Sequence, residues 1–221
     1  MRSIFKYLIK EVIIFWYRLS WHLEYLFNRK KHKIVSDVNL NKVKESKILI
    51  LIPHADDELI GCFSLIKRFS DKVILFYLGK VGNNNHHENK LIRQREIEKL
   101  SELFCIPLII SSGCPEDEIE KAIIKLKPDI IMLPYLVDWH KEHRELIYLS
   151  RNVLDKIKHK PQIGSYKITK PIPANLINCH IGLTKKDQQE KWEAFNNIYK
   201  SQSSLPVKRF MYEERIYGNW L

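Results

Sequence analysis

Four residues with acid, base or metal-binding side chains occur in the segment PHADDE, residues 53–58: His54, Asp56, Asp57 and Glu58. The segment follows the apolar run ILILI directly. Acidic side chains are rarely buried unless they are paired, and crowded carboxylates repel one another unless a cation neutralises them. A helix N-cap would account for one or two of the acids, but not for the histidine. The segment therefore favours a metal or catalytic site over a cap.

A second group of the same chemistry is DWHKEH, residues 138–143. His140 and His143 are three positions apart, a spacing at which both rings can face one cavity. Asp138 could hold the ring of His140 by accepting its other N–H, as carboxylates do beside metal-binding histidines. Two imidazoles and one or two carboxylates, with water in the open position, form a standard catalytic zinc site. Zinc lowers the pKa of that water to about 7, and an unligated carboxylate nearby can act as general base.

Both segments follow apolar runs in a chain that alternates strand and helix patterns. The strands are predicted at 47–53, 72–78, 107–111 and 129–135, and the helices at 57–69, 88–104, 116–126, 142–158 and 185–201. Apolar strands separated by helices predict an α/β fold, a Rossmann-like and mainly parallel sheet with helices on both faces. Ligands bind at the carboxyl edge of such a sheet, so both segments are expected there.

The pattern of the chain after residue 161 is less regular. Residues 162–169 and 174–181 are predicted to pair with each other as two β-strands, and the aromatic tail 210–221 could form an edge strand. No second globular domain is predicted, so the domain comprises residues 37–221, with a polar linker at 37–46.

Residues 1–36 are predicted to form a separate amphipathic helix. Aromatic and aliphatic residues occupy one face of the helix, lysine and arginine the other, and a basic cluster follows at 29–33. No charge-free run approaches the roughly 20 residues that span a bilayer, and no signal-peptide cleavage site is present. Two interpretations remain: a helix lying on an anionic membrane surface, or a helix packed on the domain or against a second subunit of a homo-oligomer.

The net charge of the 221-residue chain is +11, which favours an anionic partner. A nucleic acid is the least favoured partner, because the basic residues are spread along the chain and no reader motif occurs. The four cysteines lie far apart, and those in apolar segments are typical of reduced, buried thiols, although two disulfides remain an alternative. We therefore expect a cytoplasmic protein, peripheral at the inner face of the membrane.

Taken together, the two segments resemble the motifs of the PIG-L/LmbE family of zinc-dependent de-N-acetylases, which act on N-acetylglucosamine derivatives. PHADDE is similar to the family's [A/P]-H-P-D-D-E, and DWHKEH to its D-x-H-x-D-H. Gly79, Gly82, RQRE at 93–96 and SQ at 201–202 resemble further family features, so the resemblance covers about residues 47–215. Ala55 replaces the usual proline and Glu142 the usual aspartate, but neither change removes a catalytic group.

The resemblance implies a role for each residue of the two motifs. The implied ligands of Zn²⁺, with Fe²⁺ or Co²⁺ as alternatives, are His54, Asp57 and His143. Asp56 is the implied general base, and His140 the group that stabilises the oxyanion and protonates the leaving amine. Glu58 and Arg93 are expected to contact the substrate, with Arg95 as an alternative to Arg93.

The implied activity is that of a metal-dependent hydrolase that removes the acetyl group from an N-acetylated amino sugar. The basic charge and the N-terminal helix favour an anionic carrier, phosphorylated, nucleotide-linked or lipid-linked, in the synthesis of cell-surface polysaccharide. Two alternatives come from other classes: a metal-binding carbohydrate-binding module without catalysis, and a basic nucleic-acid-binding protein.

Overall fold

The computed structural model describes residues 12, 15, 16, 19, 23, 43, 45–79, 87–136, 138, 140–168, 172, 179–202 and 213–218. The chain divides into two compact units, residues 1–33 with 173–175, and residues 34–172 with 176–221. The predicted boundary at residue 36 lies outside the described residues. Within the predicted linker, Val43 is buried in the core of the larger unit.

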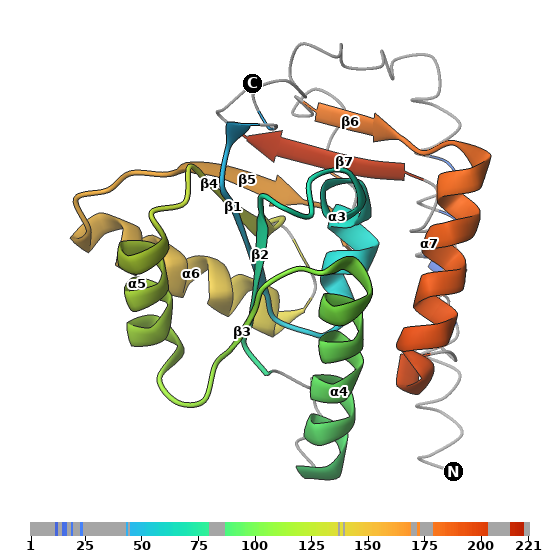
Figure 1. Cartoon of the computed structure of the whole chain (residues 1–221), viewed down its shortest axis with the longest axis horizontal. Coiled ribbons are helices and arrows are strands. Elements are labelled where there is room, and N and C mark those ends of the chain that lie inside the picture. Colours follow the sequence, from blue (N-terminus) through green and yellow to red (C-terminus); the bar gives the residue numbers. More distant parts are fainter. Residues whose placement is uncertain are drawn as a thin grey trace. The chain divides into compact units, whose positions relative to one another are not determined.

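Seven strands of the larger unit form one sheet in the order β3-β2-β1-β4-β5-β7-β6 (Figure 1). The parallel strands are β1 (Ile48–Ile52), β2 (Val73–Tyr77), β3 (Leu108–Ile110), β4 (Ile130–Pro134) and β5 (Gln162–Tyr166). The antiparallel strands are β6 (Cys179–Gly182) and β7 (Glu213–Gly218). The predicted Rossmann-like, mainly parallel α/β sheet is therefore confirmed.

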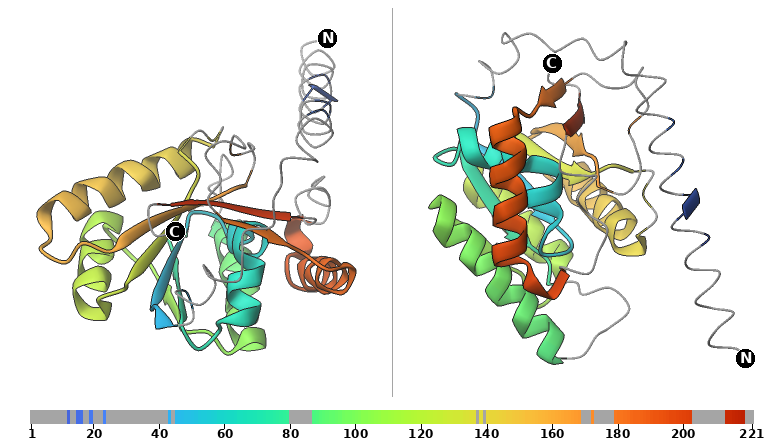
Figure 2. Two further views of the ribbon diagram at one scale, coloured as in Figure 1. Left: turned by 90° about the horizontal axis from the view of Figure 1, so that it is seen from above. Right: turned by 90° about the vertical axis from the view of Figure 1, so that its right-hand side faces the viewer.

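Five helices cover the two faces of the sheet: α3 (Asp57–Arg68), α4 (His87–Phe104), α5 (Pro115–Leu126), α6 (Lys141–Lys156) and α7 (Lys185–Ile198). Figure 2 shows α3, α4 and α7 on one face and α5 and α6 on the other. Side chains alternate across a strand, so β1 contributes to the apolar core on both faces of the sheet. Ile48, Ile50 and Ile52 pack with α3, α4 and α7, whereas Leu49 and Leu51 pack with α5 and α6. The central strand is buried on both faces, which explains its unbroken apolar sequence.

Strand β1 lies between β2 and β4. The chain places β2 and β3 on one side of β1, and then β4 and β5 on the other side. Chain order therefore reverses at β1, and the crevice beyond the carboxyl ends of β1 and β4 is a topological switch point, where open α/β sheets bind their ligands. PHADDE follows β1 and DWHKEH follows β4. The fold thus brings both segments to one crevice.

The predicted pairing of 162–169 with 174–181 is wrong. Strand β5 pairs with β4 and β7, and β6 pairs only with β7. The tail strand β7 therefore lies inside the sheet, and β6 forms the edge in its place. Strand pairing depends on contacts distant in sequence, and a buried residue of β7 makes such contacts here.

That residue is Glu214, which forms a fully buried ion pair with Lys191 of α7, at 2.7 Å. Helix α3 has non-helical backbone angles at Cys62, which leave backbone groups without helical partners. The carbonyl of Ile60 accepts a hydrogen bond from Lys191 Nζ at 2.7 Å, and the N–H of Ser64 donates to Glu214 Oε2 at 2.9 Å. The ion pair therefore satisfies the kink of α3 and fixes β7 beside it.

In the smaller unit, residues 12, 15, 16, 19 and 23 are helical, and the rest of the predicted N-terminal helix lies outside the described residues. No helix in the described part of the chain is long and apolar enough to cross a membrane. Three of the cysteines, Cys62, Cys105 and Cys114, are free thiols.

Candidate metal centre

His54 and Asp57 are held against each other in the turn between β1 and α3. The backbone N–H of His54 donates to Asp57 Oδ2 at 3.1 Å, and the N–H of Asp57 donates to the carbonyl of His54 at 3.2 Å. This reciprocal pair of bonds fixes the carboxylate before any ligand binds. Asp57 is buried at the N-terminus of α3, where the helix dipole favours its negative charge.

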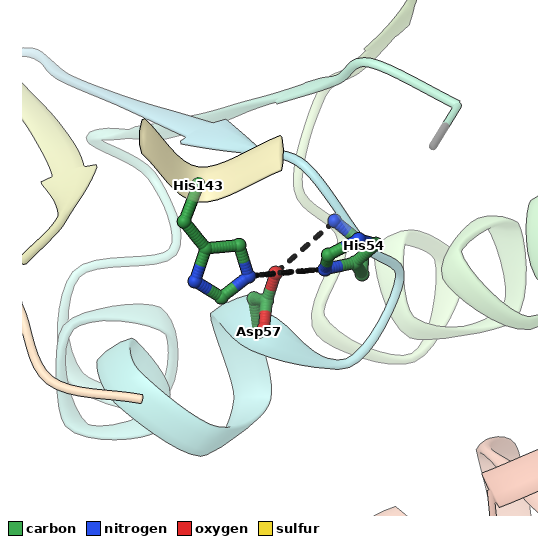
Figure 3. A group of neighbouring side chains, drawn as sticks. All are labelled: His54, Asp57 and His143. Carbon is green, nitrogen blue, oxygen red and sulfur yellow. Dashed lines mark hydrogen bonds and ion pairs between the residues drawn. The ribbon is translucent and has the colours of Figure 1, made fainter. Parts of the chain in front are cut away.

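His143 reaches the same point from the first turn of α6 and is fully buried (Figure 3). Its Nε2 lies 3.1 Å from Asp57 Oδ2 and 3.0 Å from His54 Nδ1, and His54 Nδ1 lies 3.3 Å from the same carboxylate oxygen. The three atoms thus form a nearly equilateral triangle. A tetrahedral zinc ion with bonds of about 2.0–2.1 Å requires ligand atoms about 3.3 Å apart. Two imidazoles and a carboxylate at this spacing therefore fit a divalent metal ion.

The charge balance of the triangle favours the binding of a cation. Burial alone would raise the pKa of Asp57, but His143 and His54 lower it below the usual range of an aspartate. Burial likewise opposes charge on His143, yet Asp57 and Asp138 raise its pKa to about 10. A metal ion bound at the triangle would supply positive charge beside these buried carboxylates.

Asp138 connects the two histidines of the second segment. Its Oδ1 lies 3.3 Å from His143 Nδ1 and accepts the backbone N–H of His140 at 2.9 Å. The sequence predicted the ring of His140 for this carboxylate, whereas the structure places it beside the ring of His143. Asp138 therefore lies beside the ring nitrogen of His143 that is not in the triangle.

Asp56 is the N-cap residue of α3, but its side chain makes no capping bond. Its φ of 148° and ψ of −23° lie in a region that L-residues rarely adopt, so the turn is strained here. The carboxylate is directed to Arg93 of α4, whose Nη2 lies 3.1 Å from Asp56 Oδ1. Burial raises the pKa of Asp56 to about 6, against the opposing effect of the Arg93 charge. A carboxylate with such a pKa can take up a proton near neutral pH.

His140 precedes α6 and borders the triangle without belonging to it. Its ring centroid lies 4.9 Å from that of His143 and 5.4 Å from that of His54. Loss of solvent and the neighbouring His143 lower the pKa of its ring. His140 is the exposed member of the group.

Glu58 has no exposed surface, and both of its oxygens are engaged. Tyr199, which follows α7, donates its hydroxyl to Glu58 Oε1, and the N–H of Asp56 donates to Oε2 at 3.2 Å. Burial raises the pKa of Glu58 to about 8. The carboxyl group thus ties the strained turn to the end of α7, and its predicted contact with substrate stays a prediction.

The sequence left open whether Arg93 or Arg95 of α4 belongs to the site. Arg93 is buried and reaches Asp56, whereas Arg95 is exposed, so the structure selects Arg93 for the site. The glycine-containing loop before α4, at residues 80–86, and Trp139 lie outside the described residues.

The sequence singled out SQ and RQRE as family-like features without roles for Glu96 and Ser201, and Tyr199 was missed altogether. Glu96 and Ser201 accept hydrogen bonds from Arg93, and Tyr199 donates one to Glu58. The only signal in the sequence for Tyr199 is its position two residues before Ser201.

Fold and site together define a Rossmann-like α/β protein with a candidate mononuclear metal centre at its switch point. No family model and no curated protein sequence matches the chain. Solved structures do share its fold. One is the conserved protein TT1542 from Thermus thermophilus, with a TM-score of 0.62 and 17% identity over 79% of this chain and 94% of that one.

Two further solved structures are deacetylases. A zinc-inhibited form of teicoplanin deacetylase Orf2 has a TM-score of 0.58 and 10% identity, covering 77% of this chain and 97% of that one. The A40926 pseudoaglycone deacetylase Dbv21 has a TM-score of 0.58 and 12% identity, over 78% and 96%. At such identities the likeness is one of fold. The chain therefore shares its fold with these structures.

Proposed function

We propose that this protein is a metal-dependent hydrolase that removes the acetyl group from an N-acetylated amino sugar. The observation that carries the proposal is the triangle of His54, Asp57 and His143, with Asp56 and His140 on its border. Deacetylases acting in the biosynthesis of the glycopeptide teicoplanin share the fold, which supports the same reaction class. With this assignment, membership of the PIG-L/LmbE family is part of the proposal.

The triangle would hold the metal ion, and zinc is the ion that we assign to it, with iron and cobalt as alternatives. When bound, such an ion would polarise the acetyl carbonyl and acidify a water molecule. The described residues provide two nitrogens and one oxygen, and a water molecule as fourth ligand would complete the arrangement of catalytic rather than structural zinc sites.

The chain's own residues handle the protons. Asp56 Oδ1 is paired with Arg93, and the other oxygen of the carboxylate is assigned to take the proton of the attacking water. His140 is assigned to stabilise the oxyanion that develops on the acetyl carbonyl and to protonate the departing amine. The position of its ring, 4.9 Å from the ring of His143 between centroids, supports this assignment.

The decisive experiment combines metal analysis with amine release from UDP-linked, lipid-linked and free N-acetylhexosamines. We expect about one divalent ion per chain and release of free amine from at least one substrate. Replacing Asp56→Asn should lower kcat by about 10²- to 10⁴-fold while the metal is retained. An unchanged kcat would remove Asp56 as the general base, whereas sugar binding without amine release would identify a binding module instead.

The substrate carrier is proposed to be anionic and held at a membrane surface. Residues 1–33 contain eight lysines and arginines against two glutamates. Within the same unit the helical residues Val12, Phe15, Trp16 and Leu23 are 41–63% exposed. A helix that exposes large apolar side chains beside basic ones fits the interface of an anionic bilayer. The proposed location is therefore the cytoplasmic face of the membrane.

Co-sedimentation of the full chain with phosphatidylserine-containing vesicles tests this part. The double variant Phe15→Glu, Trp16→Glu should lose most of the binding, whereas Tyr148→Glu, which changes an equally exposed aromatic residue of α6, should keep it. No binding by the unaltered chain would remove the membrane assignment. Self-association that the double variant abolishes would replace the membrane with a second copy of the chain.

A further inference from the structure

We infer that Arg93 is a positioning residue, which aims the carboxylate of Asp56 and is itself locked by Glu96 and Ser201. The inference deepens the proposed hydrolase and rests on it. It changes the expected role of Arg93, because the guanidinium acts through Asp56 instead of on the substrate.

The guanidinium of Arg93 is buried, and it spans two carboxylates. Its Nη2 lies 3.1 Å from Asp56 Oδ1, and its Nη1 lies 3.1 Å from Glu96 Oε2 and 3.3 Å from Ser201 Oγ. The ring of Tyr199 lies alongside, with 5.8 Å between the ring centroid and Arg93 Cζ. The planar fork of an arginine keeps its N–H donors in a rigid geometry, whereas the ammonium of a lysine carries three rotatable donors on a flexible stem. Arg93 is thus oriented by the protein on several sides.

Glu96 is fixed as firmly as the arginine that it holds. Ser201, in the short 3₁₀ turn Lys200–Gln202, donates its backbone N–H to Glu96 Oε1 at 2.8 Å and its hydroxyl to Oε2 at 2.7 Å. Glu96 is 5% exposed, so the bonds lie out of water and gain strength from the low local dielectric. The turn after α7 therefore determines where Arg93 can point.

Arg93 sets the direction of the Asp56 carboxylate. Its backbone is strained and its side chain does not cap α3, so nothing local fixes the carboxylate. Arg93 engages Oδ1, and the described part of the chain provides no hydrogen bond to Oδ2. Oδ2 is thereby presented as the free acceptor. A misplacement of about 1 Å can cost about 100-fold in rate, so the chain Ser201–Glu96–Arg93 fixes a position on which the proposed reaction depends.

The kinetic test compares Arg93→Lys and Glu96→Gln with Arg95→Gln, an exposed residue of the same helix. The first two variants should lower kcat by about 100-fold with KM changed less than about threefold and metal content intact. Arg95→Gln should match the unaltered enzyme. Ser201→Ala, a milder change, should show a smaller loss of kcat with the same unchanged KM. A rise in KM at constant kcat would overturn the inference and return Arg93 to the substrate.

A second measurement separates failure of this inference from failure of the proposed function. If the unaltered protein releases no amine from any N-acetylhexosamine, the hydrolase proposal fails by itself. The double-mutant cycle of Asp56→Asn and Arg93→Gln in urea unfolding still tests the connection. We expect a coupling of about tenfold or more in the unfolding equilibrium constant. Additive effects of the two substitutions would overturn the positioning role.

Discussion

His54 Nδ1 and His143 Nε2 lie 3.0 Å apart although 89 positions separate the two residues. One follows β1 and the other follows β4, the strands that flank the switch point of the sheet. Asp57 closes the triangle from the first turn of α3. The candidate metal centre is therefore assembled by two strands and the helices that follow them.

Asp138→Asn should weaken metal binding by about 10- to 100-fold, because Asp138 lies 3.3 Å from His143 Nδ1 and fixes the ring that faces the ion. Competition with a chromogenic zinc chelator measures the affinity. Glu142→Gln, a change on the residue next to His143, is the matched control and should bind metal normally. Equal affinity for Asp138→Asn and the unaltered protein would contradict the prediction.

Lys191→Met and Glu214→Gln should each destabilise the protein by about 3–5 kcal/mol. Lys191→Met leaves the Glu214 charge and the Ile60 carbonyl without their partner, and Glu214→Gln leaves the Lys191 charge unneutralised with one acceptor oxygen for two donors. The double variant should cost clearly less than the sum of the two. Urea unfolding provides the free energies. Lys186→Met, which removes an exposed pair at 3.9 Å, should change stability by less than about 1 kcal/mol. A double variant as unstable as the sum would exclude the coupling.

Gly61→Ala should destabilise by about 1–3 kcal/mol, since the added Cβ would lie 2.5 Å from Cδ2 of Tyr166 and 3.1 Å from the carbonyl of Lys167. The close approach lets α3 pack onto β5, and the Tyr166 hydroxyl donates to the Leu51 carbonyl at 2.8 Å. Gly113→Ala, whose Cβ would meet only Glu118 Oε1 at 3.6 Å, serves as control. Thermal unfolding should show a lower Tm for the first variant alone.

Asp187 should contribute stability that is lost in acid. Hydrogen bonds from Lys67 and Thr184 lower its pKa to about 2, below its value in the unfolded chain. A lowered folded-state pKa means that the stabilisation is complete above about pH 4 and disappears as the pH falls through about 2. Asp187→Asn should therefore be less stable than the unaltered protein at pH 6 and nearly equal to it below pH 2. A stability difference that persists unchanged at low pH would refute this linkage.

Much of the architecture could be predicted from local pattern. The strand runs at 48–52 and 130–134 and the helices after them follow from apolar periodicity, and the parallel sheet follows from their alternation. The pairing of the last three strands could not be predicted, because β7 pairs with β5 and anchors Glu214 to Lys191 on another element, contacts that are distant in sequence. No local pattern encodes such a contact.

The types of the functional groups were readable from the chain alone: two histidines and adjacent carboxylates behind β1 and β4 identify a metal-binding chemistry. Tertiary structure decided which side chain serves which partner. It directs Asp138 to the ring of His143 and Arg93 to Asp56. The reason is physical: ligand identity is a property of side-chain chemistry, which sequence carries, whereas orientation within an ångström depends on strands and helices that meet only after folding.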